Sequence, residues 1–222
     1  MKNILILCTG NSCRSIMAEA LVNHYLNKKE VQAYSSGVSP SGIVNPNAIR
    51  CLQEANIATD NLFSKMIDQL PITNFDLVIT VCDHAKETCP IFNSETKKIH
   101  CGFEDPTGKD YKEYVATMKL IEAVLIPTVE QTLFPKAIKD VATVSQTETG
   151  VTIELNTENE KAVQKMMQNC SEGKCECMSQ ETKNKITTMQ LLNSDNSLAI
   201  DIKGFVTKEE IEAALLKSKV TL

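Results

Sequence analysis

The chain has 222 residues, of which 42% are hydrophobic and 23% charged, proportions that are typical of a folded globular protein and argue against a disordered or fibrous one. A net charge of -5 without a run of Lys or Arg argues against a nucleic-acid partner. The apolar run at residues 4–7 is too short for a signal peptide or a membrane span, so we expect a cytoplasmic protein with no membrane partner.

Strands and helices alternate along the first 133 residues. In chain order we expect a strand at 2–7, a helix at 15–26, a strand at 31–35, a helix at 45–55, a strand at 77–81, a helical or turn-like segment at 83–89, a strand at 98–100 and a helix at 110–133. This order predicts an α/β fold, a doubly wound parallel sheet flanked by helices. In such sheets the reactive site lies beyond the carboxyl ends of the strands, where Cys8, Cys82 and Asp105 fall.

The composition changes after Pro135, beyond which the chain has no further proline. The pattern there predicts a strand at 151–155, a helix at 158–169, a cysteine loop, a strand pair at 186–192 and 198–203, and a helix at 208–218. These elements indicate a small α+β domain. We therefore place one domain at residues 1–137 and a second at residues 145–222.

Cys8 and Arg14 are separated by five residues between the first strand and the first helix. A loop in this position cradles an anion with its backbone N–H groups and favours a thiolate, so Cys8 is a candidate nucleophile for a tetrahedral oxyanion held by Arg14. We expect Gly10 to let the loop curl and Ser15 to keep Cys8 ionised through a hydrogen bond. The alternative is a buried structural cysteine. The remaining predicted loop residues are Thr9, Asn11, Ser12 and Cys13.

Asp105 follows the strand at 98–100 and precedes Pro106, which restricts the loop backbone. It is a candidate general acid that protonates a departing oxygen. A turn residue whose side chain caps its own loop is an equally good reading of this tripeptide alone. Proximity to Cys8 at the same edge of the sheet favours the catalytic reading.

Cys82 and Cys89 form a pair seven residues apart after the third predicted strand. On a continuous helix they would share a face but be separated by roughly 10 Å of rise. A disulfide needs Cα atoms within about 7 Å, so oxidation of this pair would require the segment between them to change shape. A hydrolytic enzyme has no need for these thiols, whereas a reductase must supply two electrons. The pair therefore indicates reduction, against the alternative of two unrelated buried cysteines.

Several motifs match one family in order, and the chain resembles the thioredoxin-coupled arsenate reductases over about residues 1–133. The matching motifs are Cys8-Thr-Gly-Asn-Ser-Cys-Arg-Ser15, Met17-Ala-Glu19, Asn45-Pro-Asn-Ala48, Cys82 through Cys89-Pro90, and Gly102-Phe-Glu-Asp-Pro-Thr-Gly108. The resemblance implies the low-molecular-weight tyrosine phosphatase fold. It also implies reduction of arsenate to arsenite, as in arsenic detoxification, with thioredoxin as the reductant and no cofactor required.

The family's mechanism implies a relay of three thiols. Cys8 attacks arsenate held by Arg14, and Asp105 protonates the leaving hydroxide. Cys82 then attacks Cys8 to release arsenite, and Cys89 attacks Cys82 to leave a disulfide that thioredoxin reduces. The resemblance further implies that Asn11 braces the loop and that Cys13 takes no part.

The match has departures at a position where some family members bind potassium. Asn11, Glu19 and Ser35 agree with that pattern, but Phe63 and Lys65 replace two of its residues. We expect the Lys65 ammonium to take the place of the cation. Cys101 also departs from the family pattern, and it receives no role.

Three cysteines, Cys170, Cys175 and Cys177, lie within eight residues of the second domain. Three thiolates suit a soft ion, either arsenite or a metal such as zinc or copper(I). Zinc usually requires a fourth ligand, and no histidine occurs in this half of the chain. A redox pair and a cysteine-rich turn without chemistry remain as alternatives.

Two other functions fit parts of this sequence. A low-molecular-weight protein tyrosine phosphatase would use Cys8, Arg14, Ser15 and Asp105 but not Cys82 and Cys89, and a residual phosphatase activity is compatible with a reductase. The second is an arsenite- or soft-metal-binding protein in which the C-terminal cysteines dominate. The intact set of catalytic residues argues against that function.

Overall fold

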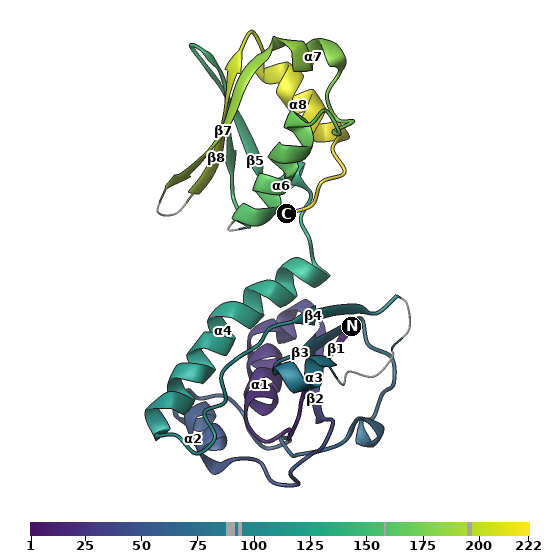
Figure 1. The fold of residues 1–222 in the computed structure, drawn as a ribbon, viewed down its shortest axis with the longest axis vertical. Helices are drawn as coiled ribbons and strands as arrows, with labels where there is room; N and C mark the ends of the chain where they lie inside the picture. The colour runs from purple at the N-terminus through teal and green to yellow at the C-terminus, as the bar shows by residue number, and fades with distance from the viewer. Residues whose placement is uncertain (88–91, 93–94, 158, 195–196) are drawn as a thin grey trace. The chain divides into compact units, whose positions relative to one another are not determined.

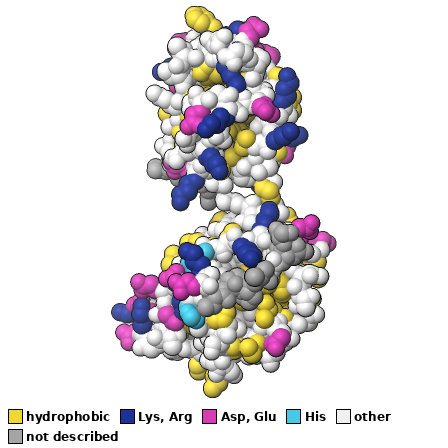
Figure 2. Space-filling view, turned by 45° about the vertical axis from the view of Figure 1, so that its right-hand side comes forward, with side chains coloured by type: hydrophobic (Ala, Val, Ile, Leu, Met, Phe, Trp, Pro, Cys, Tyr) yellow, Lys and Arg dark blue, Asp and Glu magenta, His cyan; other side chains and the backbone are white. Residues whose placement is uncertain are grey.

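The computed structural model describes residues 1–87, 92, 95–157, 159–194 and 197–222. The chain divides into two compact units, Met1–Leu133 and Phe134–Leu222 (Figure 1). Each unit has its own cluster of buried apolar side chains. Acidic and basic side chains occur together on the face of both units that Figure 2 shows.

The first unit is built on a four-stranded parallel sheet, which confirms the predicted α/β architecture. Its strands are β1 (Lys2–Cys8), β2 (Val31–Gly37), β3 (Leu77–Thr80) and β4 (Lys97–His100), in the order β2-β1-β3-β4. The central strand β1 carries the apolar run Ile4, Leu5, Ile6 and Leu7, all at most 1% exposed. An apolar run of this kind is expected of a parallel strand that is covered on both faces. Because the strands are parallel, Cys8 and the residues after β3 and β4 meet at one edge.

Helices α1 (Arg14–Leu26), α2 (Pro46–Glu54), α3 (Asp83–Glu87) and α4 (Tyr111–Leu133) complete this unit, with short 3-10 turns η1 (Asn27–Lys29) and η2 (Ile67–Gln69). Helix α2 begins after Asn45, whose side chain accepts a hydrogen bond from the Asn47 N–H at 2.9 Å, with Pro46 at the first helical position. Helix α4 buries the stripe Tyr114, Met118, Ile121, Leu125 and Val129, whose spacing of three or four residues fixes the face toward the core. Within the part of the chain that is described, no helix combines the length and apolar character needed to cross a bilayer.

The second unit is an antiparallel sheet with helices on one side, which agrees with the small α+β domain expected. Strands β5 (Ala142–Thr147), β6 (Gly150–Leu155), β7 (Ile186–Ser194) and β8 (Ser197–Gly204) pair in the order β5-β6-β8-β7. Along β6 the side chains alternate, with Val151, Ile153 and Leu155 buried and Glu154 exposed. Helices α6 (Glu160–Ser171) and α8 (Lys208–Lys217) cover the buried face (Figure 1) and contribute Val163 and Ile211 to its core.

Residues 134–137, expected in the first domain, and residues 138–144, expected between the two domains, all belong to the second unit. Helix α5 (Ile138–Val141) and the start of β5 bury Ile138, Val141 and Val144 in that core. Strand β5 was missed because it buries only Val144, so the apolar alternation of a longer strand is absent. Helix α7 (Gln180–Lys185) was also missed, because all six of its residues are polar and only its cap Ser179, which accepts from the Thr182 N–H at 3.1 Å, marks its start.

Candidate active site and a separate cysteine cluster

The predicted oxyanion loop lies between β1 and α1, with Cys8 as the last residue of the strand and Arg14 as the first of the helix. The backbone carbonyls of Cys8, Thr9 and Gly10 accept hydrogen bonds from the N–H groups of residues 38, 39 and 41 at 2.8–3.1 Å. The segment that follows β2 therefore fixes the loop from one side. Gly37 at the end of β2 permits this approach, since a Cβ there would lie 2.6 Å from the Thr9 carbonyl oxygen.

Asn11 braces the loop from inside and is fully buried. Its Nδ2 donates to Ser15 Oγ at 3.0 Å and to Ser35 Oγ at 2.8 Å, and its Oδ1 accepts from the Lys65 N–H at 2.8 Å. Asn11 also has a φ of 43°, in the left-handed region. The expected role of Gly10 is therefore corrected, because the tight part of the loop is at Asn11 and a Cβ at Gly10 would meet nothing closer than 3.8 Å.

Arg14 and Asp105 meet at the mouth of the loop. The guanidinium donates from Nη1 to the Phe103 carbonyl at 2.9 Å and from Nη2 to Asp105 Oδ2 at 2.5 Å. Asp105 Oδ1 also accepts from the Thr107 N–H at 3.1 Å, so this residue both shapes its own turn and lies beside the loop arginine. Its carboxylate is half exposed, which leaves it accessible to a ligand.

The Nε atom of Arg14 is buried and has no hydrogen-bond partner among the described residues. A buried donor without a partner costs roughly 1–3 kcal/mol, and native structures rarely keep one without a functional reason. An oxyanion in the loop is the kind of group that satisfies such a donor. The arginine therefore fits the predicted tetrahedral anion by its chemistry and by this free hydrogen-bonding capacity.

Cys82 follows β3 and faces Cys8 across the site. The two Sγ atoms are 3.6 Å apart, and Cys82 Sγ lies 3.3 Å from Thr9 Oγ1. Both thiols are buried, with 4% and 6% of each residue exposed. Since a disulfide bond is about 2.05 Å long, these sulfurs need to approach by only about 1.5 Å to bond. The structure thus brings together the loop cysteine and one member of the predicted redox pair.

The two thiols differ in acidity. Burial raises the pKa of Cys8 to about 11, although Arg14 opposes the shift. Burial acts on Cys82 in the same direction, but hydrogen bonds with Thr9, the Ala85 backbone and Cys8 outweigh it and lower the pKa of Cys82 below its usual value. Cys82 is therefore the more acidic of the two thiols, and Cys8 the less acidic.

This distribution differs from the ionised Cys8 that the sequence predicted. The expected hydrogen bond from Ser15 to Cys8 is not among those that the described residues form. The Ser15 hydroxyl oxygen instead accepts from Asn11 within the brace of the loop. The loop expected to cradle the anion is thus braced by Asn11, but the raised pKa of Cys8 differs from the ionised thiol that was expected.

Among the residues that the structure describes, the other cysteines of the first unit do not join this pair. Cys89, the third thiol expected of the relay, lies outside the described residues. Cys13 is buried, and burial raises its pKa to about 12. Cys101 is half-buried with a raised pKa for the same reason. Cys13 and Cys101 are thus protonated and poorly reactive near neutral pH.

Lys65 is buried beneath the loop, at the position where the family pattern departs. Its Nζ lies 3.2 Å from Glu19 Oε2 and donates to the Phe63 carbonyl at 3.2 Å, while Ser35 Oγ donates to the same Glu19 oxygen at 2.5 Å. Burial raises the pKa of Glu19, and the Lys65 charge opposes this. The ammonium group thus lies among the carboxylate, hydroxyl and carbonyl oxygens that would otherwise suit a monovalent cation.

Three further residues support the site and were not singled out from the sequence. Gly37 has the close approach described above, and the Tyr114 hydroxyl accepts from Asn45 Nδ2 at 3.1 Å and from the Gly108 N–H at 3.3 Å. His100 lies with Nδ1 2.8 Å from Thr80 Oγ1. A glycine at the end of a strand is the one sequence signal that could have been noticed. The contacts of Tyr114 and His100 depend on tertiary structure.

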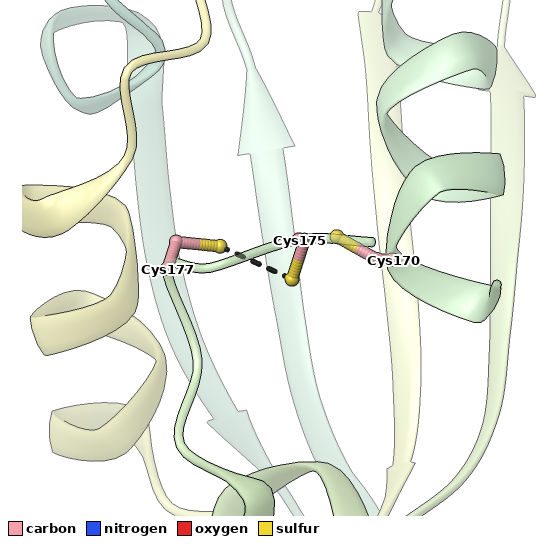
Figure 3. A group of neighbouring side chains, drawn as sticks. All are labelled: Cys170, Cys175 and Cys177. Atoms are coloured by element: carbon pink, nitrogen blue, oxygen red, sulfur yellow. Dashed lines mark hydrogen bonds between the residues drawn. The ribbon is translucent and has the colours of Figure 1, made fainter. Parts of the chain in front are cut away.

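A second group of thiols occurs in the other unit, where Cys170 lies in α6 and Cys175 and Cys177 in the loop that follows (Figure 3). Their three sulfur atoms lie within 4.8 Å of one another, and the Cys175 and Cys177 sulfurs are 3.4 Å apart. A hydrogen bond with Cys170 is the main cause that lowers the pKa of Cys177 to about 6, and the same contact raises the pKa of Cys170. The structure therefore assembles the three residues that the sequence proposed as soft ligands.

Comparison with known proteins agrees with this site. A family model described as low molecular weight phosphotyrosine protein phosphatase matches residues 3–139. An arsenate reductase from Bacillus cereus strain 03BB102 is 48% identical over 113 residues, which cover 51% of this chain and 83% of the relative. A crystal structure of a YwlE mutant from Bacillus subtilis aligns with a TM-score of 0.51 and 28% identity over 59% of this chain and 98% of that one.

A low molecular weight protein tyrosine phosphatase from T. tengcongensis shares the fold of the first unit. It aligns with a TM-score of 0.53 and 24% identity over 60% of this chain and all of that one. The family model covers more than half of the chain, including Cys8, Arg14, Cys82 and Asp105. The chain therefore belongs to the low molecular weight phosphotyrosine protein phosphatase family.

Proposed function

We propose that this chain is an arsenate reductase that converts arsenate to arsenite through thiol-disulfide exchange, as a step of arsenic detoxification. The observation that carries the proposal is the 3.6 Å separation between the Cys8 and Cys82 sulfurs at the oxyanion loop. Hydrolysis of a phosphate ester needs one nucleophilic thiol in this loop. A second thiol in contact with it is what a two-electron reduction requires.

Arsenate binding relies on the loop and on Arg14. The backbone N–H groups of residues 9–13 and the helix that begins at Arg14 favour a negative charge, with Thr9, Gly10, Asn11, Ser12, Cys13 and Ser15 forming or bracing the cradle. The planar guanidinium of Arg14 suits two oxygens of a tetrahedral anion, and its Nε supplies an unpaired donor. Arsenate has the size and charge of phosphate, so this cradle accepts both.

The first chemical step forms a bond between the Cys8 sulfur and arsenic. Because burial raises the pKa of the Cys8 thiol, the thiolate forms only as its proton passes to an oxygen of the bound arsenate dianion. The thiolate then attacks arsenic, one As–O bond breaks, and Asp105 donates a proton so that the oxygen leaves as water. Arsenic remains pentavalent in this thioester-like adduct.

The second step reduces arsenic. The Cys82 thiolate attacks the Cys8 sulfur, an S–S bond forms, and the electron pair of the S–As bond stays on arsenic. Arsenic thereby passes from the pentavalent to the trivalent state and leaves as arsenite, while the two thiols are oxidised to a disulfide. The lowered pKa of Cys82 favours formation of the attacking thiolate.

Turnover then requires that Cys8 be released. Cys89 attacks Cys82, which frees Cys8 and leaves a Cys82–Cys89 disulfide for thioredoxin to reduce. Helix α3 (Asp83–Glu87) directly follows Cys82, and we expect the residues between the two cysteines to change shape when this disulfide forms. Thiols supply both electrons of the reaction, and the relay therefore requires no cofactor.

A phosphatase activity is the second candidate function, favoured by the loop itself. Cys8, Arg14 and Asp105 suffice for transfer and hydrolysis of a phosphoryl group, and the loop geometry does not discriminate phosphate from arsenate. We propose this activity as a residual one. It would not use Cys82, because no electron transfer is involved.

Arsenate-dependent oxidation of NADPH tests the reductase proposal. The full chain is incubated with thioredoxin, thioredoxin reductase and NADPH, and its turnover is compared with that of Cys82→Ser. The proposal expects turnover that the substitution abolishes. Equal turnover by both proteins, or no arsenate-dependent oxidation by the wild type, would refute it. Cys101→Ser is the matched control, since it removes a half-buried thiol outside the relay.

A further inference from the structure

The cysteine cluster of the second unit is held in place by the end of helix α6 and by a loop whose backbone is fixed by hydrogen bonds. Helix α6 ends with the Gly173 N–H donating to the Cys170 carbonyl at 3.1 Å, and Gly173 has a φ of 74° that suits a helix-terminating glycine. Lys183 Nζ then donates to the carbonyls of Cys175 at 2.6 Å and Gly173 at 3.3 Å. The backbone that carries two of the thiols is thus fixed independently of any ligand.

The sulfurs converge at the wall of a pocket of about 440 Å³ in the same unit. All three cysteines line this pocket together with mainly apolar side chains, among them Ile153, Met166, Met178, Met189 and Ile200. The charged residues at its lining, Lys174, Glu176, Lys217 and Lys219, are all exposed. A ligand held by the three sulfurs would therefore be partly removed from water, in surroundings where a net charge is costly.

Coordination number separates the soft ions that three thiols could hold. Zinc is almost always bound by four ligands in structural sites. Among the His, Cys, Asp and Glu side chains that the structure describes, only the three cysteines come together here. Trivalent arsenic instead forms three pyramidal bonds to sulfur and keeps a lone pair in the fourth direction. The ligand set is complete for arsenic and incomplete for zinc.

The net charge of the complex also distinguishes trivalent arsenic from zinc and copper(I). Three thiolates around trivalent arsenic give a neutral complex, whereas around zinc they leave one negative charge and around copper(I) two. The Lys183 ammonium is directed at backbone carbonyls of the loop, and the Lys174 ammonium at the Glu172 carboxylate. A neutral complex is thus the one that best suits a half-buried position beside an apolar pocket.

We propose that Cys170, Cys175 and Cys177 form a binding site for trivalent arsenic. Arsenous acid exchanges its three hydroxyl groups for the three sulfurs: three S–H and three As–O bonds break, three S–As bonds form, and three water molecules leave. No oxidation or reduction takes place. That the ligand is the chain's own product rests on the proposed reductase function, but the site itself does not.

Direct binding of sodium arsenite to the reduced full-length protein tests this site. The measurement is made in the Cys82→Ser background, which lacks the relay, so that it stands whether or not the chain reduces arsenate. After gel filtration, bound arsenic is quantified by inductively coupled plasma mass spectrometry. The affinity is measured by isothermal titration calorimetry. Two variants are made in this background and compared with it. The triple variant carries Cys170→Ser, Cys175→Ser and Cys177→Ser, and the single variant carries Cys177→Ser. Added Cys101→Ser serves as the matched control.

The proposal expects one equivalent of arsenic that the triple variant loses and the Cys101→Ser control retains. The single variant should bind at least about tenfold more weakly while its thermal melting stays within a few degrees of its parent. Equal arsenic binding by parent and triple variant would overturn the proposal. So would zinc or copper(I) binding that excess arsenite does not displace, or a Cys175–Cys177 disulfide that persists after treatment with a thiol reductant.

Discussion

The Sγ atoms of Cys8 and Cys82 lie 3.6 Å apart although the two residues are 74 positions apart in the chain. Strands β1 and β3 are neighbours in the parallel sheet, with Leu7 opposite Thr80, so the residues after both strands meet at one edge. The fold therefore places a second thiol against the thiol of an oxyanion loop. This contact distinguishes a site that can reduce its substrate from one that can only transfer it.

Substitution of Cys82 should separate reduction from hydrolysis. We expect Cys82→Ser to lower arsenate turnover by at least about a thousandfold, because it removes the nucleophile of the reductive step. Hydrolysis of p-nitrophenyl phosphate should remain within about threefold of the wild type, since Cys8, Arg14 and Asp105 are unchanged. Steady-state assays of both reactions check this. A parallel loss of both activities would mean that Cys82 supports the loop and does not take part in the relay.

Substitution of Asp105 should slow the first chemical step and leave the second intact. Asp105→Asn keeps the side-chain size and the turn but cannot donate the proton, and general-acid catalysis typically contributes 10²–10⁴-fold, so we expect a loss of about that size in arsenate turnover. Rapid-quench measurement of arsenite formation gives the rate. Glu104→Gln, in the exposed neighbour that pairs with Lys109 at 3.1 Å, is the control. An equal loss in both variants would contradict an acid role for Asp105.

The pKa difference between the two thiols predicts the order of their alkylation. Cys8, whose pKa burial raises to about 11, should react slowly with iodoacetamide at pH 7.5 and faster as the pH rises toward 11, whereas Cys82 with its lowered pKa reacts first. In Cys82→Ser the charge and hydrogen bond that raise the Cys8 pKa are gone, so Cys8 alkylation near neutral pH should accelerate. Peptide mapping by mass spectrometry follows each site. Faster labelling of Cys8 than of Cys82 in the wild type would contradict the assignment.

Lys65 should act as a built-in cation beneath the loop. Lys65→Ala leaves the buried Glu19 carboxylate without its partner, and removing one member of a buried ion pair costs about 3–5 kcal/mol. We expect a lower melting temperature that potassium, but not sodium, partly restores, and no potassium effect on the wild type. Lys65→Met combined with Glu19→Gln is the control, because it leaves no unpaired charge. A potassium-dependent stabilisation of the wild type would contradict this role.

The fold of the first unit could be predicted largely from its sequence. The apolar runs at β1 and β3 and the spacing of the buried stripe on α4 are local signals. The oxyanion loop is indicated by Cys8 and Arg14, which are separated by five residues. The position of Asp105 near the oxyanion loop followed from the rule that the carboxyl ends of parallel strands meet at one edge. Each of these inferences depends on residues that are close in sequence or on a general topological rule.

Features that depend on tertiary contacts could not be predicted in the same way. The pKa of Cys8 is raised by its burial and by the neighbouring Cys82. The Ser15 hydroxyl accepts a hydrogen bond from Asn11. Strand β5 is held in the sheet by its antiparallel pairing with β6, because it buries only one apolar side chain. Convergence of Cys170 with Cys175 and Cys177 depends on how α6 ends, which a spacing alone does not fix.

A single turnover without reductant tests the central claim most directly. Fully reduced protein is mixed with one equivalent of arsenate, quenched in acid, and assayed for total trivalent arsenic and for free thiols. The account predicts one arsenite formed and two thiols lost per chain in the wild type, with a Cys8–Cys82 disulfide trapped in Cys89→Ser and neither change in Cys82→Ser. Arsenite formed by Cys82→Ser at the wild-type rate, or none formed by the wild type, would contradict it.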